Sequence, residues 1–222
     1  MASAPPSPYR PLPLIACSVA ACAAASVLLV LVAVGWGPLL AFDEDLARTT
    51  HRWALDHPAM TRTQRVLTDW VWDPWTMRLL AAVVTVRLWM QGRRRSALCC
   101  AVTCVLATVL QQVLKAAVDR DRPVWADPVD SARYQAFPSG HAMTAVVVLG
   151  LCLWVLRMHA VRGPLWWSAV AGVTVSVLGV GWTRVWLGVH WPTDVMGGWL
   201  LGTLAVLVAV LAHDRARRTR SA

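Results

Sequence analysis

Charged residues are scarce in this sequence of 222 residues: they make up 15% of the chain, whereas apolar residues make up 57%. A soluble domain of this composition would have to hide several runs of about twenty apolar residues from water. The composition therefore excludes an ordinary soluble globular protein and indicates a single integral membrane domain.

A continuous basic stripe is also missing, although the formal net charge is +9. The basic residues come in short groups between apolar runs, which membrane topology explains better than nucleic-acid binding. We therefore predict no nucleic-acid partner. All six cysteines lie inside apolar segments without metal-ligand spacing, so we interpret them as small core residues.

The apolar runs divide the chain into three parts and predict an all-α fold. Residues 1–11 are rich in proline and serine and are expected to form a disordered tail, and residues 214–222 a basic cytoplasmic tail. Between them, residues 12–213 are predicted to form a six-transmembrane-helix bundle, in which Arg78 and Arg87 snorkel towards the ends of the second span. Residues 43–73 are expected to form one or two short helices on the membrane surface. The expected spans are 12–40, 74–90, 96–118, 139–157, 165–182 and 192–213.

The distribution of charge predicts the orientation of this bundle. Six spans place both termini on one side, where the tails and short connections carry ten arginines and a single acid, Asp214. By the positive-inside rule, this side faces the cytoplasm. The turn at Arg93–Arg95 is interpreted as a topology determinant that also attracts anionic lipid. We therefore predict a multi-pass protein of the cytoplasmic (inner) membrane, with both termini in the cytoplasm.

The first polar stretch that this topology places at the outer face runs from Lys115 to Pro123. Lys115 is the only lysine in the chain, and it lies seven residues before Arg122. Taken alone, the stretch allows two interpretations. Either Lys115 snorkels and Arg122 is solvated, or the two cations converge on an anion such as a phosphate.

The second stretch is Pro138-Ser139-Gly140-His141, which directly precedes an apolar helix. Ser139 is expected to cap the helix, and Gly140 would let a ligand approach free backbone amides that favour anions. His141, in the first turn, could protonate a leaving oxygen. The simpler alternative is a helix cap followed by a polar interface residue.

The third stretch places Arg184, His190 and Asp194 between two apolar runs, where ionisable groups are costly. An aspartate that accepts a hydrogen bond from one imidazole nitrogen leaves the other nitrogen free to attack. The alternative is that Asp194 only complements a helix N-terminus while His190 is interfacial. All three stretches are predicted to share the extracytoplasmic face.

Together, the three stretches resemble the signature of the type 2 phosphatidic acid phosphatase family, K-x6-R-P, P-S-G-H and S-R-x5-H-x3-D. The one departure is Thr183, where the family usually has serine. The resemblance implies that His190 is the nucleophile, that Asp194 orients it and that His141 is the general acid. It also implies no metal and no cofactor. The residues that it implies for phosphate binding are Lys115, Arg122, Ser139, Gly140 and Arg184.

This resemblance predicts an integral membrane enzyme that hydrolyses a lipid phosphate or diphosphate through a phosphohistidine, with its active site facing outward. Polyprenyl diphosphate, phosphatidic acid and phosphatidylglycerophosphate are all possible substrates. One alternative is a lipid phosphotransferase that uses the same histidine and aspartate. Another is a non-catalytic protein that binds or transports lipid headgroups. The expected partners are the lipid phosphate and the bilayer, and the motifs do not indicate an oligomeric state.

Overall fold

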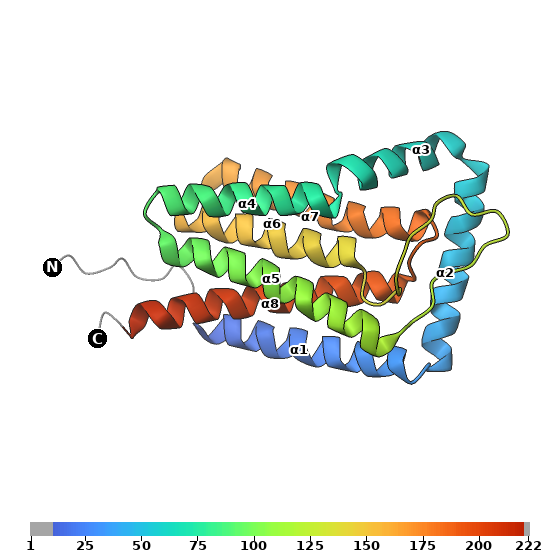
Figure 1. Ribbon diagram of the computed structural model, residues 1–222, viewed down its shortest axis with the longest axis horizontal. Helices are drawn as coiled ribbons and strands as arrows, with labels where there is room; N and C mark the ends of the chain where they lie inside the picture. The colour runs from blue at the N-terminus through green and yellow to red at the C-terminus, as the bar shows by residue number, and fades with distance from the viewer. Residues whose placement is uncertain (1–10, 220–222) are drawn as a thin grey trace.

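The regular elements of the protein are all helical in the computed structural model, which describes residues 11–219. The predicted all-α fold is therefore confirmed. The helices α1, α4, α5, α6, α7 and α8 run along the long axis, while α2 crosses one end of the bundle (Figure 1). The elements are α1 (Pro11–Ala33), α2 (Gly37–Asp56), α3 (Pro58–Val66), the π-helical turn η1 (Leu67–Val71), α4 (Pro74–Met90), α5 (Arg94–Val118), α6 (Gly140–Met158), α7 (Gly163–Trp186) and α8 (Pro192–Arg218).

Within residues 11–219, five helices are long and apolar enough to cross a membrane, namely α1, α5, α6, α7 and α8. Their exposed leucines and valines give the bundle an apolar outer surface suited to lipid. The protein is therefore a multi-pass membrane protein. The remaining bundle helix, α4, has 17 residues and packs against α5 and α6. At ~1.5 Å per residue it is roughly 26 Å long, close to the hydrocarbon thickness, and its role as a sixth span stays a prediction.

The first apolar run is interrupted earlier than we expected. Helix α1 ends at Ala33, and α2 begins at Gly37, inside the predicted span 12–40. Gly35 has a φ of +65°, a left-handed conformation that glycine adopts without steric cost. The chain therefore turns there, and the polar segment that follows forms α2, α3 and η1. Of the expected tail at residues 1–11, all but Pro11 lies outside the described residues.

The last helix is longer than predicted, because α8 continues from His213 to Arg218. Nothing between these residues breaks a helix, and its last turn carries Arg215, Arg217 and Arg218, whose charges favour a helix C-terminus. Residues 214–218 are thus helical, while 220–222 lie outside the described residues. Helix α8 ends at the same end of the bundle at which α1 begins, away from α2 (Figure 1).

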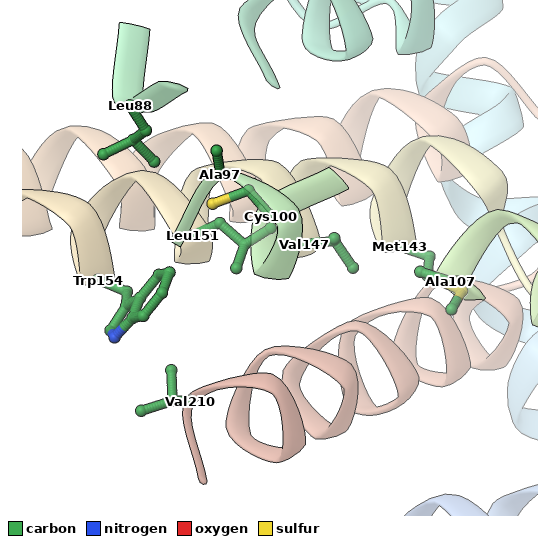
Figure 2. Packing of buried hydrophobic residues seen from close by; sticks show 9 residues of the cluster. All are labelled: Leu88, Ala97, Cys100, Ala107, Met143, Val147, Leu151, Trp154 and Val210. Carbon is green, nitrogen blue, oxygen red and sulfur yellow. The ribbon is translucent and has the colours of Figure 1, made fainter. Parts of the chain in front are cut away.

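The main core lies between α4, α5, α6 and α8, and Figure 2 shows its side chains converging from these helices. Cys100 is buried there as expected, but Cys17 and Cys22 on α1 are exposed, so these two are not core residues. The cluster comprises Leu88, Ala97, Cys100, Ala107, Met143, Val147, Leu151, Trp154 and Val210.

Small residues on α8 allow α6 to approach it closely. A Cβ atom at Gly198 would lie 2.7 Å from the carbonyl oxygen of Ser139, and one at Gly202 would lie 2.9 Å from Cβ of Val146. Both distances are too short for a real Cβ contact, so only glycine fits. This close packing brings the start of α6 against the start of α8.

Candidate active site

A polar loop, residues 119–139, lies over the α2 end of the bundle and joins the first two motif stretches (Figure 1). Lys115, in the last turn of α5, donates a hydrogen bond to the carbonyl of Gln135. Arg122 donates to the carbonyls of Tyr134 at 2.7 Å and Arg133 at 2.9 Å. These bonds to backbone oxygens hold both cations in place beside the start of α6.

His190 lies in the short turn between α7 and α8, and Asp194 lies in the first turn of α8. Pro192 opens this helix, and the Asp194 side chain accepts the backbone N–H of Trp191 at 2.8 Å. The same carboxylate oxygen lies 3.3 Å from Nδ1 of His190. On the other side of the ring, Nε2 lies 3.1 Å from Nη1 of Arg122. An arginine can only donate, so these contacts assign the proton to Nδ1 and the free lone pair to Nε2.

The surroundings of His190 favour a neutral imidazole. Its side chain is buried, and burial lowers the pKa of His190 well below its ordinary value, with Arg122, Arg184 and Lys115 lowering it further. Burial also lowers the pKa of Arg122. Because a protonated imidazole has no lone pair to offer, this environment keeps Nε2 in the form that can attack an electrophile.

His190 lines a cavity of about 410 Å³ that residues 130–134 of the loop also line. Its walls come from η1, α4, α5, the loop, α6 and α7, so segments far apart in the sequence meet here. Ser139 and Asp194 are fully buried next to these walls. The predicted site residues that line the cavity are Lys115, Arg122, Gly140, His141, Arg184 and His190.

Two hydrogen-bond donors at this site are buried without a partner among the residues that the structure describes. They are Nε of Arg184 and the hydroxyl of Ser139. Arg184 donates to Thr68 through Nη1 at 3.1 Å, so η1 fixes one side of its guanidinium while Nε has no partner among the described residues. The backbone N–H of Ser139 donates to the Asp194 carbonyl at 2.9 Å, which ties the second motif to the third. Unsatisfied donors beside cations suit an anion with several oxygens.

A buried network behind the histidine was not identified from the sequence. Arg120 donates to Asp194 through Nη1 and to Asp43 through Nη2, each at 2.6 Å. Asp43, from α2, also accepts the backbone N–H of Thr193 at 2.9 Å. The only local signal was that Arg120 stands two residues before Arg122. Nothing in the sequence links it to an acid at position 43.

The cavity also has residues that the motifs do not include. Arg78 lines it, with its guanidinium carbon 5.1 Å from the Trp75 ring, so this arginine contributes positive charge to the site instead of only snorkelling. Asp69, Asp73 and Asp130 form part of the same wall. Burial raises the pKa of Asp69, and the neighbouring Asp130 raises it further. The cavity is thus cationic around His190 and acidic along the η1 side.

Comparisons with known proteins identify relatives over part of the chain. Over 115 residues, the chain is 34% identical to phosphatidylglycerophosphatase B of Bacillus subtilis, covering 50% of this chain and 55% of that protein. Over 147 residues, it is 32% identical to undecaprenyl-diphosphatase of Sulfolobus acidocaldarius, covering 64% and 63%. The chain thus matches less than two thirds of the length of either relative.

The fold has a solved counterpart. The crystal structure of a transmembrane PAP2-type phosphatidylglycerolphosphate phosphatase from Bacillus subtilis superposes with a TM-score of 0.72, at 23% identity, covering 84% of this chain and 92% of the other. At this identity the likeness concerns the fold alone. The profile of the PAP2 superfamily matches residues 96–218, which include all three motif stretches. Since this match covers more than half of the chain, the protein belongs to the PAP2 superfamily.

Proposed function

We propose that the protein is a membrane phosphatase that hydrolyses a lipid phosphomonoester or diphosphate. The observation that carries this proposal is the pair formed by Nδ1 of His190 and Asp194, 3.3 Å apart, beside a cationic cavity that His190 lines. The two relatives, named for phosphatidylglycerophosphate and undecaprenyl diphosphate, support a lipid substrate. A cavity at one end of an apolar bundle suits a molecule whose phosphate enters while its tail stays in the bilayer.

In the first step, Nε2 of His190 attacks phosphorus and the bond from phosphorus to the lipid-side oxygen breaks. The leaving oxygen takes a proton from His141. Asp194 accepts the Nδ1 hydrogen bond and stabilises the positive ring as the P–N bond forms. Lys115, Arg122 and Arg184 stabilise the charge that develops on the phosphoryl oxygens.

In the second step, water attacks the phosphohistidine and gives a proton to His141. The P–N bond breaks, inorganic phosphate leaves, and His190 regains the lone pair on Nε2. This sequence restores both histidines to their starting protonation states, so no further reactant is required.

Release of inorganic phosphate from purified protein tests the proposal. The panel contains undecaprenyl diphosphate, phosphatidic acid and phosphatidylglycerophosphate, each offered with and without a lipid alcohol. Phosphate released into water supports hydrolysis. Phosphate that appears only on the added alcohol would establish the phosphotransferase instead. Binding of these lipids without turnover would establish the non-catalytic alternative.

We also propose that α4 is the sixth span and that the catalytic cavity faces outward from the inner membrane, with both termini in the cytoplasm. The arginines of the α4–α5 turn and of the last turn of α8 support this orientation. A cysteine introduced at Gln91 should be protected from a membrane-impermeant maleimide in intact cells, whereas one introduced at Asp127 should react. The reverse pattern would contradict the proposed topology.

Replacing Ser139 with alanine is expected to reduce phosphate release about tenfold while leaving the melting temperature almost unchanged. The hydroxyl is buried and has no hydrogen-bond partner among residues 11–219, so its removal breaks no hydrogen bond that the structure shows. A phosphoryl oxygen would lose one donor. Phosphate release and thermal unfolding in the same detergent measure the two effects. Unchanged activity, or a large loss of stability, would contradict a phosphate-binding role.

The imidazole of His190 is expected to stay neutral as the pH falls below about 6.5, its ordinary pKa. Burial lowers the folded-state pKa, so below that pH the unfolded chain binds a proton that the folded protein does not. The stability supplied by this difference is present above pH 6.5 and is lost as the pH falls towards the folded-state pKa. A ¹³C NMR titration of labelled histidines follows the ring directly.

The His190→Gln variant assigns this signal, because the resonance is absent from its spectrum. It also serves as the stability control, since its melting temperature should fall less steeply between pH 7 and pH 5 than that of the unaltered protein. A titration midpoint at or above 6.5 for the assigned signal would show that the buried cationic setting does not govern this histidine.

A further inference from the structure

The end of the bundle opposite the catalytic cavity contains a second hollow of about 700 Å³, called here the basic cavity. The α4–α5 turn, the end of α6 and the end of α8 come together there (Figure 1). None of the catalytic motifs contributes to it. Its charged lining consists of Arg93, Arg94, Arg95, Arg157, Arg162 and Arg217, together with His213.

Positive charge dominates this cavity. Aromatic rings support two of its arginines, since Arg94 lies 5.4 Å from the centre of the Trp89 ring and Arg157 lies 5.3 Å from that of Trp166. In the part of the chain that the structure describes, neither Arg95 nor Arg162 forms an ion pair. Guanidinium groups in these two settings can bind the oxygens of a phosphate.

An apolar groove of about 620 Å³ continues from the basic cavity between α5 and α8. Arg95 and His213 line both, so the two hollows share a boundary. At ~1.5 Å per residue, the stretch of α5 from Arg95 to Leu110 is roughly 22 Å long, enough to reach the middle of a bilayer. The groove is lined on its two sides by Leu98, Val102, Leu106, Leu201, Leu204 and Val208.

His213 fixes the junction between the two hollows. Its Nε2 lies 3.2 Å from the hydroxyl of Ser96, and its ring meets Trp154 edge-on with centroids 4.9 Å apart. Trp154 belongs to the core that Figure 2 shows, so the junction is anchored in well-packed structure. Asp214, 3.7 Å from Nδ1 of His213, adds one negative charge at this end.

We propose that the basic cavity and the apolar groove together bind one anionic phospholipid. Its phosphate would lie among the arginines, and one acyl chain would lie between α5 and α8. The arginines of the basic cavity would then contact the anionic headgroup, and the apolar side chains of the groove would contact the acyl chain. A second copy of the chain fits less well, because its own arginines would bring like charge to the same end. The site is independent of the proposed catalysis.

Native mass spectrometry of the full-length protein in detergent tests this site. The probes are dioleoylphosphatidylglycerol, dioleoylphosphatidylcholine with the same chains, and inorganic phosphate alone. We expect one tightly bound phosphatidylglycerol. Arg95→Gln combined with Arg162→Gln should weaken it about 30-fold. The matched control combines Arg87→Gln with Arg215→Gln, which remove two exposed charges outside the cavity.

The groove is tested with Leu106→Trp, which fills it, against Leu79→Trp, which places the same ring on an exposed face of α4. Loss of phosphatidylglycerol from the first variant alone supports the proposal. Equal loss from both arginine pairs would overturn it in favour of diffuse surface charge. Inorganic phosphate that binds equally to Leu106→Trp would show a free-phosphate site. A shift from dimer to monomer in this variant without loss of lipid would show that the groove is an interface between copies.

Discussion

Replacing His190 with glutamine is expected to reduce phosphate release by about 10⁴-fold or more. Glutamine has a similar size and can accept a hydrogen bond from Arg122, but the lone pair of its amide nitrogen is delocalised into the carbonyl and does not attack phosphorus. The melting temperature should change little, because the variant retains most of the packing of the α7–α8 turn. Phosphate release from a lipid phosphate at saturating concentration measures the loss.

The matched control is His159→Gln, which changes an exposed histidine at the opposite end of the bundle. This variant should retain full activity. Acid-quenched protein incubated with ³²P-labelled substrate adds a direct readout, since label should stay on the unaltered protein and be absent from His190→Gln. Activity within tenfold of normal in His190→Gln would mean that another group forms the bond to phosphorus.

The local part of this site could be predicted from the sequence, because each motif is confined to a few residues. Pro192 and Asp194 belong to one helical turn, and His190 stands only four residues before Asp194, so the two side chains are expected to lie close together. Likewise, Lys115 and Arg122 flank the end of one helix. The alternation of apolar runs with polar connections was sufficient to predict that the helix ends carrying the three motifs lie at one face. The structure adds that they share a single cavity.

Contacts across long sequence separations could not be predicted in this way. Asp43 and Asp45 stand two residues apart in the same acidic segment, yet only Asp43 is buried against Thr193. The difference in burial between these two aspartates depends on how α2 crosses the end of the bundle, and this crossing depends on the turn at Gly35. We missed that turn because we interpreted the apolar run as one span, although Gly35, Gly37 and Pro38 together signal a helix end. The role of Arg120 depends on the same crossing, because its partner Asp43 lies on α2.

Replacing Arg120 with methionine is expected to destabilise the protein by about 3–5 kcal/mol and to reduce phosphate release about 100-fold. The change leaves Asp43 and Asp194, which are 1% and 0% exposed, without the cation that lies 2.6 Å from each. Two unpaired carboxylates in a buried site repel each other and cost desolvation energy. Asp194 would then shift away from Nδ1 of His190, so Arg120 acts as a positioning residue.

A second change separates the two effects of Arg120. Adding Asp43→Asn to Arg120→Met removes one of the two unpaired charges, so thermal unfolding should show part of the lost stability restored. Activity should remain low, because Asp194 still lacks the guanidinium that fixes its Oδ1 while Oδ2 faces His190. Arg62→Met, at an exposed position of α3, is the control and should change neither property. If the double variant regained full activity, charge on Asp43 would be the cause of the loss, and Arg120 would have no part in positioning Asp194.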